Sequence, residues 1–152
     1  MTEVPADVRD YINEQHTLTL ATTSSDGVPR ASTYLYVSDG SRLFFWTRLN
    51  SASARNIAER PVVAFAIDEY ADDLRQSRGV HGLGECSTVT GEDIARAADL
   101  FGQKFPNLQP GNTASISFFA IVPTELEFTD NRQAGASPAE GTFGAEFHTQ
   151  RL

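Results

Sequence analysis

The segment from Phe44 to Phe65 constrains the fold of this chain more than any other, because it reads as strand, hinge, helix and strand in close succession. The run FFWT is aromatic and β-branched, a composition that suits a pleated surface and predicts a strand. Asn50 or Ser51 can cap a short helix, and Pro61 ends it, since proline disfavours the α conformation in the residue before it. The apolar run at 62–67 then predicts a second strand.

The start of this short helix is a candidate anion site. A helix N-terminus offers unpaired N–H groups and the positive end of the helix dipole, where phosphate or carboxylate groups bind. Ser51 and Ser53 would add hydroxyl donors. The alternative is a capped crossover helix that binds nothing, and the sequence alone leaves both interpretations open.

Charge is distributed unevenly along the chain. The net charge is −8, yet the segment from Arg30 to Arg60 contains five arginines and only two acidic residues. Nucleic-acid binding requires a broad basic face, so this short basic segment in an acidic protein argues against a nucleic-acid partner. It is compatible with one small anionic ligand held near the segment.

Short strands dominate the remaining pattern, and two helices accompany them. Two Asp-Gly pairs predict a three-stranded meander. The alternate glycines Gly82 and Gly84 predict a bend or a close backbone approach in their strand. Thr90 together with Asp93 predicts a helix cap. The predicted strands are 17–23, 29–37, 42–47, 80–88, 115–122 and 125–129, with a break at Pro123, and the predicted helices are 5–14 and 91–105. Within the second helix the predicted core-facing stripe is Ile94, Ala97, Ala98, Phe101 and Phe105.

Composition narrows the class of protein further. A length of 152 residues fits one domain with a real core. The single cysteine, Cys86, excludes an internal disulfide and is expected to be a small buried hydrophobe. The N-terminus lacks the apolar region of a signal peptide, and the apolar runs are too short to cross a bilayer, so a cytoplasmic protein without a membrane partner is expected. The three histidines have no metal-ligand spacing, so no metal site is expected.

Several motifs, taken in their order, resemble one known superfamily. They are LATTSSDGVPRAS from Leu20, FFWT from Phe44, SASARNIAERP from Ser51 and RGVHGLGE from Arg78. Over residues 5–130 the chain resembles the flavin-binding split-barrel superfamily typified by pyridoxamine 5'-phosphate oxidase. The late runs KFPNL and TDN are closer to a small, poorly characterised branch of it. The implied fold is mainly β, of the α+β class: a six- to seven-stranded antiparallel split β-barrel with two or three peripheral helices, followed by a tail at 131–152 that is mobile or docks on a dimer partner.

The resemblance also implies a cofactor and its contacts. In the superfamily, flavin mononucleotide (FMN) lies at a homodimer interface against the second strand, the end of the third strand and the first turn of the crossover helix. Carried over to this chain, these contacts are Ser32, Thr33, Tyr34, Trp46, Thr47, Ser51 and Ser53. Four basic residues of the oxidase pattern are replaced here, by Ser32, Val37, Ala52 and Ser53. We expect Arg48 and Arg55 to take over the contacts with the phosphate.

Two functions follow from these observations. The first is an FMN-dependent oxidoreductase that acts on a small soluble substrate, in which the flavin ring carries the redox chemistry and no acid or base side chain is strictly required. The second is a non-catalytic binding or carrier module that keeps the barrel and has lost tight flavin binding. The missing charges favour the second function, because a charge-assisted hydrogen bond to phosphate is about twice as strong as a neutral one.

Overall fold

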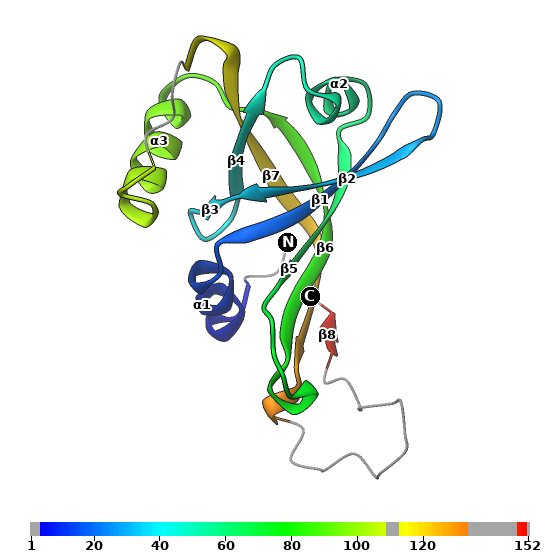
Figure 1. Ribbon diagram of the computed structural model, residues 1–152, viewed down its shortest axis with the longest axis vertical. Helices are drawn as coiled ribbons and strands as arrows, with labels where there is room; N and C mark the ends of the chain where they lie inside the picture. The colour runs from blue at the N-terminus through cyan, green and yellow to red at the C-terminus, as the bar shows by residue number, and fades with distance from the viewer. Residues whose placement is uncertain (1–3, 109–112, 134–148, 152) are drawn as a thin grey trace.

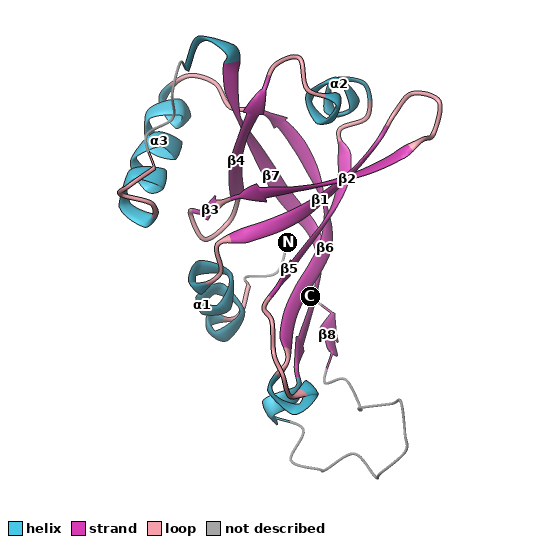
Figure 2. Ribbon diagram, in the orientation of Figure 1, coloured by secondary structure: helices cyan, strands magenta, loops and turns pink. Residues whose placement is uncertain are grey.

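In the described part of the chain, a single antiparallel sheet curls into a split barrel and carries three α-helices on its outside (Figures 1 and 2). The computed structural model describes residues 4–108, 113–133 and 149–151. The helices are α1 (Ala6–Glu14), α2 (Ala52–Glu59) and α3 (Glu92–Lys104). None of the described helices has the length and apolar character that crossing a membrane requires.

The strands lie in the order β2-β1-β5-β6-β7-β4-β3, and the short β8 pairs with β7. Their bounds are β1 (Thr17–Thr23), β2 (Pro29–Leu35), β3 (Val37–Ser38), β4 (Leu43–Arg48), β5 (Val62–Asp68), β6 (Arg78–Thr88), β7 (Ile116–Asp130) and β8 (Thr149–Arg151). The predicted α+β split barrel is therefore confirmed.

The chain itself joins the two ends of this sheet at Tyr36. β2 pairs with β1, and β3 pairs with β4, so the single residue between β2 and β3 connects the first strand of the order to the last. Tyr36 is fully buried, and its N–H donates to the carbonyl of His16. The predicted meander is confirmed only in part: the second hairpin forms, but β4 has only two residue pairs with β3 and forms its long ladder with β7.

Two glycines of β6 allow β7 to bend without breaking. Gly82 pairs with Leu126 and Gly84 with Pro123, and the register shifts between these pairs, which leaves one extra residue in β7. A β-bulge of this kind accommodates a proline, which cannot donate to the ladder. A Cβ atom on Gly82 would lie 2.1 Å from the carbonyl oxygen of Glu125. The close backbone approach predicted for the glycines is confirmed, and the prediction that Pro123 separates two strands was wrong.

Two hydrophobic clusters hold the helices on the sheet. The barrel interior takes apolar side chains from α1 and α2, including Tyr11 and Ile57, and in Figure 1 these helices cover different ends of the barrel. The second cluster lies between the outer side of β4 and β7 and the helix α3, which contributes Ala97 and Phe101. The predicted stripe on α3 is only partly correct, since Ile94 is 47% exposed and Ala98 is also exposed.

The ends of α3 differ from the predicted cap. The N-cap is Gly91, with a φ of 62°, and no side chain caps the helix there. Asp93 instead accepts from Arg42 at 2.8 Å, and Arg42 also donates to Asp39, whose side chain is 3% exposed. The hydrogen bonds from Arg42 lower the pKa of Asp93. This ion-pair network ties the start of α3 to the β3–β4 turn.

The C-terminal segment is described only in part. Asn131–Gln133 forms a 3-10 helix directly after β7, and β8 pairs with β7 through Glu127, Phe128 and Thr129. Residues 134–148 lie outside the described residues, so the interpretation of the tail as mobile or as docking on a partner stays a prediction.

Candidate functional site

The start of α2 lies at the end of β4, where the sequence placed the anion site. Ser51 is the N-cap, as one of the two predicted alternatives: its hydroxyl oxygen accepts from the N–H of Ala54 at 3.1 Å. The N–H of Arg55 donates to the carbonyl of Ser51. The N–H groups of Ala52 and Ser53 find no acceptor among the described residues. The cap therefore uses part of the helix end and leaves two amides for an anion.

Four predicted hydroxyl residues meet beside this helix end. The Tyr34 hydroxyl donates to the Ser53 oxygen at 2.9 Å, and the Thr47 hydroxyl donates to the Ser51 oxygen at 3.3 Å. Ser53 is only 3% exposed, whereas Tyr34 and Ser51 are partly open to solvent. β2, β4 and α2, which are separate in the sequence, thus contribute hydroxyl groups to one small region, here called the α2 hydroxyl cluster (Tyr34, Thr47, Ser51 and Ser53).

Both predicted replacement arginines lie at this end of the molecule and are exposed. Arg55 folds back over the first turn of α2, as expected, and its Nη1 donates to the carbonyl of Asn50 at 2.7 Å. Arg48 ends β4, one residue after Thr47, and no carboxylate of the described residues forms an ion pair with it. An incoming phosphate would therefore not have to break an ion pair of either arginine.

The remaining three predicted contacts are arranged differently. Ser32 pairs with Leu20, and Tyr34 with Leu18, so both side chains lie on the inward face of β2. Thr33 points to the outer face and is exposed. Trp46 belongs to the second hydrophobic cluster beneath α3, on the face of β4 opposite to Thr47. The structure thus gathers Tyr34, Thr47, Ser51 and Ser53, and separates Thr33 and Trp46 from them.

Two polar contacts near α2 were not predicted from the sequence. Asn56 donates to the hydroxyl of Thr22 at 3.0 Å, and Thr22 is only 2% exposed. Arg60 donates to the carbonyl of Ser25 at 2.9 Å and fastens the β1–β2 hairpin to the end of α2. Neither pair has a local sequence signal, since the partners are more than thirty residues apart.

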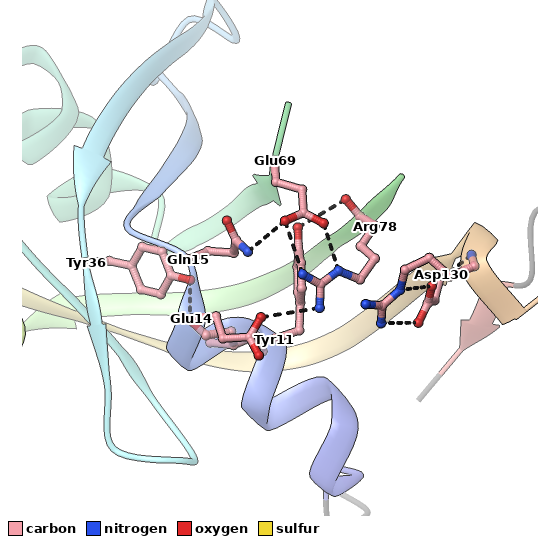
Figure 3. A network of polar contacts seen from close by, with 9 residues as sticks. Tyr11, Glu14, Gln15, Tyr36, Glu69, Arg78 and Asp130 are labelled. Atoms are coloured by element: carbon pink, nitrogen blue, oxygen red, sulfur yellow. Dashed lines mark hydrogen bonds and ion pairs between the residues drawn. The ribbon is translucent and has the colours of Figure 1, made fainter. Parts of the chain in front are cut away.

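A second polar network lies around Arg78, next to α1 (Figure 3). Arg78 contacts Glu69 at 2.7 Å and Glu14 at 3.3 Å, and its guanidinium lies 4.8 Å from the centroid of the Tyr11 ring. The hydrogen bond from Arg78 lowers the pKa of Glu69. Gln15 also donates to Glu69, at 3.2 Å.

A pocket of about 400 Å³ opens beside this network, lined by residues 69–73 with Gln76, Arg78 and Arg132. Its lining residues surround the short 3-10 helix Leu74–Gln76, and Figure 1 shows this part of the chain at the end of the molecule opposite to α2. Its two arginines are already engaged, Arg78 by Glu69 and Arg132 by Asp130 at 2.9 Å. An anion would have to displace these carboxylates, so the pocket does not compete with the α2 start as a phosphate site.

Cys86 is buried, and the described residues bring no cluster of metal-binding side chains together. Cys86 is 1% exposed, and burial raises the pKa of its thiol to about 12, so it carries no thiolate near neutral pH. The buried structural role predicted for Cys86 is confirmed. The described residues contain no group of three or more His, Cys, Asp or Glu side chains that could hold a metal ion.

Comparison with known families decides where the chain belongs. A family model described as pyridoxamine 5'-phosphate oxidase matches residues 4–130, which contain α1, α2, α3 and the strands β1 to β7. The chain belongs to the pyridoxamine 5'-phosphate oxidase family. The resemblance inferred from the sequence motifs is thus confirmed. The match starts one residue before the 5–130 range of that resemblance and ends at the same residue.

The individual proteins and solved structures that are similar to the chain are distant from it in sequence. A protein of Klebsiella pneumoniae named UPF0306 protein is 24% identical over 150 residues, which is 98% of this chain and 95% of that protein. The crystal structure of a conserved hypothetical protein from Mycobacterium tuberculosis has a TM-score of 0.76 at 21% identity and covers 95% of this chain and 97% of its own. The heme storage protein HutZ of Vibrio cholerae has a TM-score of 0.65 at 21% identity, over 80% of this chain and 91% of its own.

Proposed function

We propose that this protein binds FMN, with the flavin phosphate at the start of α2, and acts as an FMN-dependent oxidoreductase on a small soluble substrate. The observation that supports the proposal is the start of α2, where two amides without an acceptor among the described residues and two exposed arginines lie beside the α2 hydroxyl cluster. Amide donors, a positive helix end and arginine together suit a phosphate dianion. Membership of the family makes flavin the cofactor to test first.

The residues of the site fit a phosphate in spite of the four replaced basic residues. The amides of Ala52 and Ser53 would hold the phosphate from within the helix, and Arg55 would exchange the Asn50 carbonyl for a phosphate oxygen. This exchange replaces a neutral acceptor by a charged one and is favourable. The flavin, once bound, would supply the redox chemistry, while Tyr34 and Thr47 would orient it through their hydroxyl groups.

We further propose a homodimer that uses the outer face of β5, β6 and β7. Val62, Leu83 and Val122 are 59%, 41% and 47% exposed. Glu85 pairs with Val62 on one side and with Val122 on the other, so these three side chains lie in one row. Leu83, two residues before Glu85 in β6, lies on the same face. Exposed apolar side chains that gather on one surface mark interfaces. Light scattering should give about twice the chain mass, and a monomer at micromolar concentration would contradict the homodimer.

Flavin titration of two matched variants tests the phosphate site. In the wild-type protein, FMN should bind more tightly than riboflavin, because only FMN carries the phosphate. Arg55→Ala should weaken FMN binding by about tenfold or more, the loss of one charged hydrogen bond, and leave riboflavin binding unchanged. Flavin fluorescence quenching measures both ligands.

Arg60→Ala is the matched control, since Arg60 is also an exposed arginine of this region that donates to a backbone carbonyl. This variant should bind FMN as the wild-type protein does. Equal weakening of FMN and riboflavin by Arg55→Ala would contradict the role given to Arg55, and a protein that takes up neither flavin would exclude the proposed cofactor.

A non-catalytic binding role is the second candidate, and one contact favours heme as the cargo to test. His81 is exposed, and its Nε2 lies 3.3 Å from the carboxylate of Glu127. A carboxylate behind a histidine orients the ring as a metal ligand. The structural similarity to a heme storage protein suggests hemin as the ligand. Addition of hemin should give a Soret shift that His81→Ala abolishes, and an unchanged spectrum would exclude this candidate.

A further inference from the structure

The pocket of about 400 Å³ around the 3-10 helix Leu74–Gln76 has no part in the proposed function. A cavity of this volume can hold a small organic molecule. Its lining is polar and charged: Glu69, Asp72 and Asp73 supply three carboxylates, whereas two arginines supply guanidinium groups. The balance of these charges decides which class of ligand the pocket can bind.

The charges of the lining do not cancel. Both lining arginines are already held by carboxylates, at 2.7 and 2.9 Å. Asp72 is different, because no basic side chain of the described residues forms an ion pair with it. It accepts a hydrogen bond from the Tyr70 hydroxyl, at 2.6 Å. Asp72 thus leaves one negative charge at the pocket for which the described residues supply no counter-ion.

Tyr70 adds an aromatic ring beside this carboxylate. The residue is 90% exposed, so the face of its ring is open to a ligand, while the hydroxyl is held by Asp72. The face of an aromatic ring attracts an ammonium group. A carboxylate and an open aromatic face side by side therefore favour a cationic amine over an anion or a neutral molecule.

A buried acceptor lies directly behind the lining. The Asn131 side chain donates through Nδ2 to the carbonyl of Leu74 at 2.9 Å, and its backbone N–H donates to the carbonyl of Ser77 at 3.0 Å. Asn131 thus lies between the end of β7 and the 3-10 helix, next to the lining residue Arg132. It is only 7% exposed, and its Oδ1 accepts no hydrogen bond from the described residues. Since an unsatisfied buried acceptor is costly, this atom favours a ligand that carries N–H donors.

We propose that this pocket binds a linear aliphatic diamine. One ammonium group lies against the Tyr70 ring and donates to the Asp72 carboxylate, and the other end of the molecule donates to the Asn131 Oδ1. A metal ion fits the lining less well, because the described residues bring no three His, Cys, Asp or Glu side chains together around one point. An extended dication instead spreads its two charges along a lining that also contains Glu69 and Asp73.

The probe for this site is 1,4-diaminobutane, titrated into the isotope-labelled full chain with the amide signals as the readout. Saturable shifts should appear at residues 69–78 and 131–132, and the side-chain amide signals of Asn131 should shift with them. Butane-1,4-diol has a chain of the same length without charges and should cause no shifts. Butylamine, with a single ammonium group, should bind about tenfold more weakly than the diamine.

Two pairs of variants locate the charge and the ring. Asp72→Asn should weaken the binding of 1,4-diaminobutane by about tenfold or more. Asp26→Asn is the matched control: it removes the same charge from an exposed residue of the β1–β2 hairpin, which Figure 1 shows away from the 3-10 helix, and should leave binding unchanged. Tyr70→Leu should weaken binding about two- to fivefold, whereas Tyr70→Phe keeps the ring and should bind as the wild type does.

Three results would overturn the proposal. Equal weakening by Asp72→Asn and Asp26→Asn would mean that the diamine is attracted only by the overall negative charge of the protein. Shifts spread over α1 and α3 rather than centred on the pocket would mean the same. An Asn131 side chain whose signals do not move would remove the acceptor from the site. Flavin does not enter these titrations, so their outcome leaves the proposed function at α2 unaffected.

Discussion

Replacing Gly82 with alanine should lower the free energy of unfolding by about 3 kcal/mol or more. The new Cβ would lie 2.1 Å from the backbone oxygen of Glu125 and 3.1 Å from side-chain atoms of Leu126 and Phe65. The backbone oxygen cannot rotate away as a side chain can, so the bulge between β6 and β7 would have to move. Urea denaturation followed by tryptophan fluorescence measures the change.

Gly79→Ala is the control in the same strand. Its Cβ would meet only the carbonyl oxygen of Ile67, at the ordinary contact distance of 3.5 Å. This variant should stay within about 0.5 kcal/mol of the wild type. If Gly82→Ala does not accumulate as soluble protein while Gly79→Ala does, the prediction is met. Equal stability of the two variants would contradict the close approach of β7 to β6.

Replacing Arg78 with methionine should be the second most damaging change, with a loss of about 2 to 3 kcal/mol. Arg78 has 16% of its side chain exposed and holds two carboxylates, Glu69 and Glu14, while it lies against the Tyr11 ring. Methionine keeps the packing of the aliphatic part, but among the described residues it leaves Glu69 with a hydrogen bond from Gln15 alone. Denaturant titration near neutral pH measures the loss.

The effect of Arg78 should also depend on pH in a defined direction. Arg78 lowers the pKa of Glu69 from its ordinary 4.5, so this stabilisation is present above that value and is lost as the pH falls through the lowered pKa. The difference between wild type and Arg78→Met should therefore shrink in acid. Arg75→Met is the control, because Arg75 makes an exposed ion pair with Asp73 that solvent screens, so this variant should be nearly as stable as the wild type. Equal losses in the two variants would exclude Arg78 as the centre of the network.

The local sequence pattern predicted the helices and strands of this fold better than it predicted which strands pair with each other. The strand at Thr17–Thr23 and the capping role of Ser51 follow from composition and turn chemistry, and both are as expected. The pairing of β4 with β7 joins residues about seventy positions apart, which no local periodicity encodes. The prediction of a strand break at Pro123 was wrong for the same reason, since the bulge that accommodates this proline depends on Gly82 and Gly84 in another strand.

The candidate site was predictable to a similar extent. Hydroxyl residues at the end of one strand and at the start of the next helix pointed to the region of Thr47, Ser51 and Ser53. The orientation of Trp46 depends on which face of β4 is covered by α3, and this is decided by distant contacts. The ion pair of Arg78 with Glu14 was not predicted, because Glu14 lies in α1, far from Arg78 in the sequence.

The phosphate site at α2 is tested most directly by backbone amide mapping of isotope-labelled protein titrated with FMN and, separately, with riboflavin. The predicted result is that the largest shifts with FMN occur at the amides of Ala52 and Ser53, with further shifts around Thr47 and Tyr34. Riboflavin should shift Ala52 and Ser53 much less, because it has no phosphate to accept from them. Shifts centred on the pocket beside Arg132, or no shifts at the start of α2, would contradict the proposed site.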